Sequence, residues 1–493
     1  MIGLASLPGL DVRRRSVVRL GQVELGIART ESGERLAALA PQRPDGLDRL
    51  EGEVSSVEGR WLLVGPTNPR NLFLLQSVLP RMTPRPLGLR RSFGFGDRLG
   101  CATPGHIRAL RAVGADLAPI FAQQSIREME RTSRTPAQVM HDAIWGVFAE
   151  GWQDGFGADA DHLKTPADID ACLAAGYTFF TFDPGAYVDS AGDSMPVGRL
   201  GAALESLPWE ALEDSRGALR ERYAALVLDL PGQLLRVDEE SAARAAVKYG
   251  RAVAHVTTLY RHLRARRADA EVEVSVDETD TPTTPAQHAY IALELRRLGV
   301  QWVSLAPRFV GRFEKGVDYL GDPGAFEADA AVHAELTRRL GPYKLSLHSG
   351  SDKLSVYGAL ARQGGSLVHV KTAGTSYLEA LRTIAALDPR LFRAIYTLAR
   401  AQFEQDRVTY HVSASVERAP GPDAVSDADL GSLLDNFDAR QVLHVTFGSA
   451  LARYGERVRA MLRAHPEAYE ADLERHFIPH LSPFAPSASE ARG

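Results

Sequence analysis

The chain has 493 residues, 45% of them hydrophobic and 24% charged, which is typical of a globular protein with a large buried core. A formal net charge of −5 excludes a broadly basic surface for nucleic acid, and two cysteines, Cys101 and Cys172, are too few for a disulfide framework or a thiolate metal cage. Because no apolar run approaches the roughly 20 residues that span a bilayer and no secretory signal is visible, we expect a cytoplasmic protein with no membrane partner.

The N-terminal part of the chain has the pattern of short antiparallel strands. Apolar and polar residues alternate between positions 17 and 39, as they do in strands with one buried face. Prolines at positions 80, 84 and 86 then interrupt the pattern, which is typical of a domain edge. We therefore predict a small β-rich N-terminal extension over residues 1–85.

From about residue 90 onward, short apolar runs alternate with helical stretches, which are clearest at residues 104–113, 285–298 and 376–387. Nine runs are typical of buried strands: residues 92–96, 156–163, 177–182, 272–276, 302–306, 344–347, 367–370, 409–412 and 442–446. This alternation favours parallel βαβ units, so we predict an α/β fold, a TIM-like (β/α)8 barrel over residues 86–465, with one run left for an extension. Residues 466–493 are predicted to form a loosely held C-terminal tail.

Most of the predicted strands end in polar residues, and this distinguishes two α/β architectures. In a barrel every strand delivers its last residues to one mouth, whereas an open doubly wound sheet places its site at one switch point. Polar ends follow most of the runs, so the barrel is favoured. Gly-rich pieces at residues 94–96 and 364–365 match no nucleotide-binding fingerprint.

Three histidines at predicted strand ends are candidate ligands of a divalent metal. Alternation along each strand turns His162, together with the alanines at 158 and 160, toward the inside of the barrel, and does the same for His348 and His369. Neutral imidazole binds zinc, manganese, nickel or iron, and three protein ligands leave positions open for substrate oxygens. A single buried histidine is more often a hydrogen-bonded core residue, but three at strand ends favour a site. The reserve candidates in later apolar runs are His411 and His444.

Acidic residues also follow the predicted strands, and the candidates are Asp161, Asp183, Asp277 and Glu278. Two carboxylates on opposite sides of a substrate carbon can remove a proton from one face and return it to the other. Alternation favours Asp277 as the inward residue, but a bend at the strand end would expose Glu278 instead, so both remain open.

Lysine occupies only six of the 57 basic positions, so we expect lysines mainly where a compact ammonium does what a planar guanidinium cannot. Arg308, Lys353 and Lys371 follow predicted strands and are candidates for binding a substrate carboxylate, although an ion pair with a neighbouring aspartate is an equal alternative. Asp183 and Asp277 are counted with them as predicted substrate contacts.

Six segments resemble the tagaturonate/fructuronate epimerase family: residues 94–98, 158–165, 275–282, 316–322, 344–353 and 369–377. The resemblance extends from about residue 90 to residue 451. It implies reversible interconversion of D-tagaturonate and D-fructuronate by a divalent-metal enzyme, and in some members also of the neutral ketoses tagatose and fructose. Carried onto matching positions, it implies a metal site at His162, His348 and His369, with Asp161 and Glu278 as the acid/base pair.

Inversion at a hydroxyl-bearing carbon β to a ketone limits the mechanism, because enolisation of the ketone does not acidify the hydrogen on that carbon. Two routes remain: retro-aldol cleavage, rotation and re-addition, or direct hydrogen exchange between opposed carboxylates. A metal-dependent aldolase or ketose isomerase on the same barrel is the enzymatic alternative, and a sugar-acid-binding protein without turnover is the non-enzymatic one. The expected partner is a small hexuronate or ketohexose, and a homo-oligomer is left open.

Overall fold

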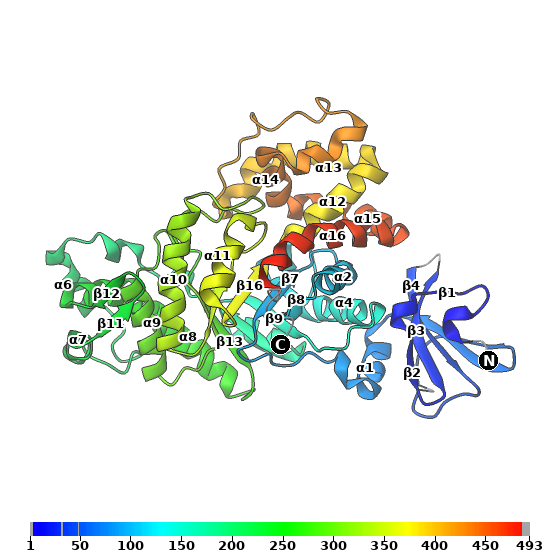
Figure 1. Ribbon diagram of the computed structural model, residues 1–493, viewed down its shortest axis with the longest axis horizontal. Coiled ribbons are helices and arrows are strands. Elements are labelled where there is room, and N and C mark those ends of the chain that lie inside the picture. Colours follow the sequence, from blue (N-terminus) through cyan, green and yellow to red (C-terminus); the bar gives the residue numbers. More distant parts are fainter. Residues whose placement is uncertain (1–2, 31–32, 48, 486–493) are drawn as a thin grey trace.

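An antiparallel sheet lies at one end of the molecule in the computed structural model, which describes residues 3–30, 33–47 and 49–485 (Figure 1). Its strands run in the order β1-β3-β4-β6-β5, and β2 pairs with β3. The bounds are β1 Asp11–Val12, β2 Val18–Leu20, β3 Val23–Thr30, β4 Gly33–Ala40, β5 Glu53–Val57 and β6 Arg60–Pro66. Helix α1, Pro69–Val78, follows the sheet and begins at an Asn68 cap with proline in its first turn, where the missing N–H costs no hydrogen bond.

Eight parallel strands close into a barrel in the order β10-β13-β14-β15-β16-β7-β8-β9. Their bounds are β7 Ser92–Gly96, β8 Ala118–Ser125, β9 Gly157–Leu163, β10 Phe179–Phe182, β13 Glu271–Ser275, β14 Ser304–Ala306, β15 Lys344–Leu347 and β16 Val368–Thr372. The predicted TIM-like barrel with an N-terminal β-containing extension is therefore confirmed. All parallel strands deliver their carboxyl ends to one mouth, which is where a site is expected in this fold.

Seven of the nine predicted strands lie in the barrel, and the other two predictions are wrong. Residue 409 ends a short 3-10 turn, Arg407–Thr409, and residues 410–412 belong to no helix or strand, while residues 442–446 lie at the end of helix α14, Phe437–Val445. Short apolar runs do not distinguish a strand from a buried helix by periodicity alone. The eighth barrel strand, β8, was missed because Pro119 and two glutamines make it unlike a central strand.

Helices cover the outside of the barrel and build a layer above it (Figure 1). Those next to the strands are α2 Thr103–Val113, α3 Ile126–Arg131, α4 Pro136–Ala149, α5 Pro166–Ala174, α8 Glu239–Arg264, α9 Pro285–Arg297, α10 Pro323–Arg339, α11 Leu354–Gly364 and α12 Thr375–Leu387. Beyond α12 come α13 Pro389–Asp406, α14, α15 Phe447–Ala464 and α16 Pro466–Leu481. Several start with a capping box followed by proline, for example Thr284 before α9, so local sequence sets these helix starts.

The C-terminal segment is a packed helix from Pro466 to Leu481, which corrects the predicted loose tail. Helix α16 buries Tyr469, Leu473 and Phe477. It approaches α2 so closely that a Cβ placed on Gly105 would lie 2.6 Å from the Cβ of Leu473. The apolar face of α16 is therefore part of the core, and residues 486–493 of the predicted tail lie outside the described residues.

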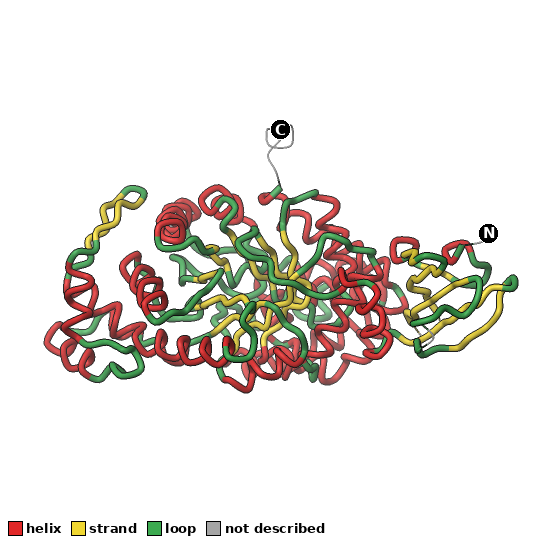
Figure 2. Tube along the Cα trace, turned by 90° about the horizontal axis from the view of Figure 1, so that it is seen from below, coloured by secondary structure: helices red, strands yellow, loops and turns green. Residues whose placement is uncertain are grey.

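At the end opposite the N-terminal sheet, the chain between β10 and α8 forms a separate excursion, labelled in Figure 1 and seen from below in Figure 2. It consists of α6 Val197–Glu205, α7 Arg216–Ala224 and a hairpin of β11 Val227–Leu230 with β12 Gln233–Arg236. Within the described ranges, no helix combines the length and apolar character that crossing a membrane requires.

Candidate active site

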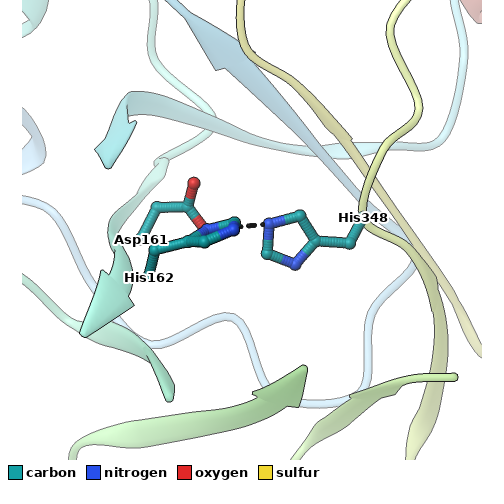
Figure 3. A group of neighbouring side chains, drawn as sticks. All are labelled: Asp161, His162 and His348. Atoms are coloured by element: carbon teal, nitrogen blue, oxygen red, sulfur yellow. Dashed lines mark hydrogen bonds and ion pairs between the residues drawn. The ribbon is translucent and has the colours of Figure 1, made fainter. Parts of the chain in front are cut away.

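Three side chains at the mouth of the barrel turn their donor atoms toward one point (Figure 3). Asp161 Oδ1 lies 3.1 Å from His162 Nδ1 and 3.2 Å from His348 Nε2. The two imidazole nitrogens are 3.1 Å apart. We call Asp161, His162 and His348 the mouth group; it joins the end of β9 to the end of β15.

A bulge in β9 brings two consecutive residues of this group to the same side. The pairing of β9 with β10 shifts register just before Leu163, and His162 has a φ of 55°. Such a bulge interrupts the alternation of side chains, so Asp161 and His162 both face the mouth. The prediction that the alanines at 158 and 160 line the inner face is wrong, because Asp159 and Asp161 contact the barrel-lining Lys371.

The donor set and the spacing of the mouth group fit a divalent ion. The three donor atoms are 3.1 to 3.2 Å apart, so one ion about 2.1 Å from each of them could be held by all three. Behind the group, His348 Nδ1 faces Glu273 Oε1 at 3.4 Å and Asp277 Oδ1 at 3.9 Å. Carboxylates in this position orient a ligating imidazole and raise its basicity.

The electrostatic field of the mouth group favours a cation. Burial lowers the pKa of His162, but Asp161 and Glu278 outweigh burial and hold that pKa well above its usual value. Burial likewise opposes protonation of His348, while Asp277 and Asp161 raise its pKa to about 9. The same negative field that favours protons on these imidazoles favours a dication in their place, since metal binding exchanges protons for metal.

Lys371, which was predicted to bind a substrate carboxylate, lies beneath the mouth group, and its ammonium group is paired with three carboxylates of the protein. Its Nζ is 2.6 Å from Asp159 Oδ2, 3.0 Å from Asp161 Oδ1 and 3.1 Å from Glu273 Oε1. Burial alone would lower the pKa of Lys371, but these three carboxylates raise it above its usual value. The ammonium therefore fixes the inner carboxylates rather than presenting a free charge to a ligand.

His369 lies deeper in the barrel, outside the mouth group, which corrects the predicted ligand set. Its Nδ1 is 2.9 Å from Ser92 Oγ, and its ring lies 5.3 Å from that of Phe179. Burial, followed by the nearby ammonium groups, lowers the pKa of His369 to about 3 despite Glu273. Asp161, which was predicted to transfer a proton, is instead the third residue whose donor atom converges with those of His162 and His348.

Glu278 borders the mouth group from the other side of His162. Its Oε2 is 3.6 Å from His162 Nε2, and its Oε1 is 3.1 Å from Lys315 Nζ and 4.0 Å from an Arg127 Nη. Burial raises the pKa of Glu278, but Lys315, His162 and Arg127 together hold it well below its usual value. Glu278 is therefore an ionised carboxylate at neutral pH.

Asp277 and Glu278 each contact a histidine of the mouth group, at 3.9 and 3.6 Å, although neither lines the cavity, and this answers the question that alternation left open. Asp277 accepts hydrogen bonds from Ser275 Oγ at 2.6 Å and Ser349 Oγ at 3.0 Å. The structure thus places Asp277 beside His348, with its Oδ1 3.9 Å from Nδ1 of that ring, and its contact with substrate stays a prediction.

The other predicted substrate contacts lie away from the open part of the cavity or are already saturated. Lys353 Nζ donates to the carbonyl oxygens of Glu314, Val317 and Ser351 at 2.9, 2.6 and 2.9 Å, and burial lowers its pKa to about 8. Asp183 Oδ2 is 3.2 Å from Lys164 Nζ, and neither Asp183 nor Arg308 lines the cavity at the mouth.

Several cavity-lining side chains were not assigned from the sequence: Arg98, Gln123, Arg127, Glu128, Lys315 and Tyr410. Signals existed for two of them, since Arg98 ends the 94–98 segment and Lys315 is one of the six lysines. Gln123 was not assigned to the site because its strand, β8, was not predicted. His444 lines the cavity from helix α14 rather than from a strand, and His411, the other reserve ligand, is exposed outside it.

Comparison with known proteins relates the whole chain to one group of enzymes. The family model described as tagaturonate epimerase matches residues 14–484. A tagaturonate/fructuronate epimerase from Thermotoga maritima is 42% identical over 475 residues, 96% of each chain. Crystal structures of fructuronate-tagaturonate epimerase from Cohnella laeviribosi superpose with a TM-score of 0.90 at 34% identity; the glycerol complex covers 96% of both chains, and the native structure covers 98% of this chain and 97% of its own.

Proposed function

This chain belongs to the tagaturonate epimerase family, and from that premise we propose that it interconverts D-tagaturonate and D-fructuronate with a divalent ion held by the mouth group. It is an epimerase of the isomerase class. The observation that carries the metal proposal is the triangle of Asp161 Oδ1, His162 Nδ1 and His348 Nε2, with sides of 3.1 to 3.2 Å. Zinc, manganese, nickel and iron all accept this mixture of imidazole and carboxylate.

A divalent ion at this position would act as a Lewis acid toward the ketone of the sugar. The chain's own residues supply the remaining functions. Lys371 holds Asp161 in place, Glu273 and Asp277 orient His348, and Glu278 stands as an ionised carboxylate at the edge of the mouth. This division of roles leaves Glu278 as the group that takes and returns a substrate proton.

We assign the retro-aldol route to the reaction. Direct exchange requires two carboxylates on opposite faces of the substrate carbon, but Asp161 is tied to Lys371 and both Asp161 and Glu278 face the same imidazole, that of His162. One carboxylate is enough for the retro-aldol route. Glu278 takes the proton of the hydroxyl on the carbon to be inverted, the bond to the α carbon breaks, and its electron pair passes to the ketone as an enolate. The aldehyde rotates, the bond forms again on the other face, and the proton returns to the new alkoxide.

Turnover of D-tagaturonate by the purified, metal-loaded chain tests the activity directly. We expect D-fructuronate to form, and no reaction with bound tagaturonate would instead support a binding protein. Sustained release of three-carbon fragments would indicate an aldolase, and formation of an aldose would indicate a ketose isomerase.

Running the reaction in deuterated water tests the route. We expect no deuterium on the inverted carbon, because its hydrogen stays in place when the neighbouring carbon–carbon bond breaks. Deuterium at that carbon would establish direct exchange and exclude the retro-aldol assignment.

A further inference from the structure

Three residues that line the cavity carry buried hydrogen-bonding atoms without a partner among the described residues. They are one terminal guanidinium nitrogen of Arg98 (Nη1), both side-chain polar atoms of Gln123 and the Nδ1 of His444. All three residues line the cavity, and they are 2%, 1% and 1% exposed. Buried polar groups in folded proteins nearly always have partners, so these atoms are available to bind a polar ligand or water that enters the cavity.

The neighbours of Arg98 hold its guanidinium in one orientation. Its Nε and Nη2 both donate to Glu128 Oε1, at 2.8 and 2.5 Å, and its central carbon lies 3.7 Å from the centre of the Phe447 ring. Glu128 is itself fixed at the start of α3, where its N–H donates to Ser125 Oγ. The pair with Glu128 therefore occupies one edge of the guanidinium and leaves Nη1 unused.

The first turn of α12 lies against the same wall. No side chain caps this helix at Gly374, and Gly374 lines the cavity together with Ala373. A Cβ on Gly374 would lie 2.1 Å from Cε1 of His444, so only glycine allows this imidazole to approach the helix start. The N-terminal end of a helix favours negative charge, which adds to the field of Arg98.

The other cations near the cavity all have partners, but they are paired to different degrees. Lys371 contacts three carboxylates and Thr181, and Lys353 contacts three carbonyl oxygens. Lys315 and Arg127 lie 3.1 and 4.0 Å from Glu278. Arg98 thus offers a cationic N–H that has no acceptor in the described chain.

We propose that Arg98, with Gln123 and His444, forms the subsite that binds the carboxylate of the hexuronate. This inference rests on the proposed function and adds how the enzyme selects a sugar acid over the neutral ketose, which has CH2OH in place of the carboxylate. In the retro-aldol route the carboxylate stays on the aldehyde fragment. The subsite therefore also retains the fragment that must rotate before the bond forms again.

The test replaces the charge of Arg98 without leaving Glu128 buried and unpaired. Removing Arg98 alone would strand that carboxylate, so the main variant is the double substitution Arg98→Met with Glu128→Gln, compared with Glu128→Gln alone. We expect KM for D-tagaturonate to rise at least 30-fold in the double variant relative to Glu128→Gln, with metal content unchanged. KM within about threefold of Glu128→Gln would overturn the subsite.

Two further variants keep the test decisive. Arg98→Lys retains a charge for Glu128 but removes the free guanidinium N–H, so KM for tagaturonate should rise about tenfold even if the double variant does not fold. Arg453→Met is the control: this arginine lies over an aromatic ring, that of Tyr454, at 5.7 Å, but it is exposed and does not line the cavity, and we expect KM within about twofold of wild type.

Calorimetry separates failure of the subsite from failure of the proposed function. If the wild-type holoenzyme binds tagaturonate without turnover, the activity proposal fails, and binding to the variants still decides the subsite. Equal affinity of the wild type and Arg98→Lys for tagaturonate would overturn it, whereas weaker binding of tagaturonate to Arg98→Lys, with unchanged binding of D-tagatose, would support it.

Discussion

The described part of the molecule contains two groups made of one aspartate and two histidines, and their surroundings differ. The mouth group joins β9 to β15 and borders the cavity. The second, which we call the α16 group, consists of Asp352, His476 and His480 and joins the loop after β15 to the C-terminal helix.

The α16 group uses its lone pairs internally. Asp352 Oδ1 lies 2.7 Å from His476 Nε2 and 3.1 Å from an Nη of Arg440, and the other ring nitrogen of His476 is 3.1 Å from Glu379 Oε1. His480 Nδ1 donates to the carbonyl oxygen of His476, and its Nε2 accepts the N–H of Asp352. The contacts of Asp352 with Arg440 and His476 and the hydrogen bonds of His480 make this group an ion-pair network that joins α16 to the loop after β15.

The comparison teaches that residue types within reach of one another do not make a metal site. In the mouth group three donors converge and the nearest cation, Lys371, approaches from beneath and is balanced by two further carboxylates. A cation also lies at the carboxylate oxygen of each group, since Lys371 Nζ is 3.0 Å from Asp161 Oδ1 and an Nη of Arg440 is 3.1 Å from Asp352 Oδ1. The groups differ in their access to the cavity, because all three residues of the mouth group line it and none of the α16 group does.

The largest effect is expected from breaking the mouth group. His348→Ala removes one of three converging donors, so metal content should fall from about one per chain to less than about 0.1, and kcat should fall about 10³-fold or more. Metal analysis and turnover of the purified protein measure both quantities. His480→Ala is the matched change in the α16 group and should retain the metal. Equal metal loss in both variants would contradict the distinction between the groups.

The second effect separates metal binding from proton transfer. Glu278→Gln keeps the shape of the side chain and lies outside the donor triangle, so metal content should stay unchanged while kcat falls about 10²- to 10³-fold. The control is Glu417→Gln, a substitution on the exposed surface, which should have no effect on kcat. A kcat for Glu278→Gln within about threefold of wild type would remove Glu278 from the mechanism.

The third effect tests whether the α16 group is structural. Arg440→Met leaves the buried carboxylate of Asp352 without its guanidinium, and the free energy of unfolding should fall by roughly 2 to 3 kcal/mol. Chemical denaturation measures the loss. Arg457→Met, which removes a mostly exposed arginine near Asp388, should cost less than about 0.5 kcal/mol. Loss of the bound metal in Arg440→Met without loss of stability would reverse the roles of the two groups.

The smallest effect is a pH dependence of the α16 group. Burial raises the pKa of Asp352, but Arg440, His476 and His480 outweigh burial and hold it well below its ordinary value of 3.8. A depressed carboxyl pKa contributes stability that is fully present above the ordinary pKa and is lost as pH falls through the folded-state value. The stability difference between wild type and Asp352→Asn should therefore be constant near neutral pH and shrink below about pH 4. A difference that instead shrinks as pH rises would show that another group titrates.

Much of the barrel could be predicted because its strands carry local signals. Strands β7 and β15 have the predicted bounds, since apolar residues alternate with small or polar ones along both strands. Strand β8 has no such signal, because Pro119 and its glutamines fit a strand only within the closed sheet. The run at 442–446 became helical because apolar composition alone does not choose between helix and strand.

The candidate site was predicted in part. His162 and His348 were placed at strand ends, and they do meet. The bulge in β9 that turns His162 toward the mouth was not predicted, because the argument from alternation assumed that β9 is a regular strand. Sequence features marked Arg98 and Lys315, but no role was predicted for either residue. Their ion-pair partners, Glu128 and Glu278, lie 30 and 37 residues away in the sequence, so local patterns did not connect them.

By itself, the sequence determined the barrel, the polar character of its mouth and the family, because these follow from periodicity and from segments of consecutive residues. Only the tertiary structure decided which charges neutralise one another. Lys371 became an internal counter-ion, His369 became part of the barrel interior, and Arg98 kept an unused N–H on the cavity wall. The physical reason is that the state of a buried charged group depends on all of its neighbours at once, and those neighbours come from strands and helices far apart in the chain.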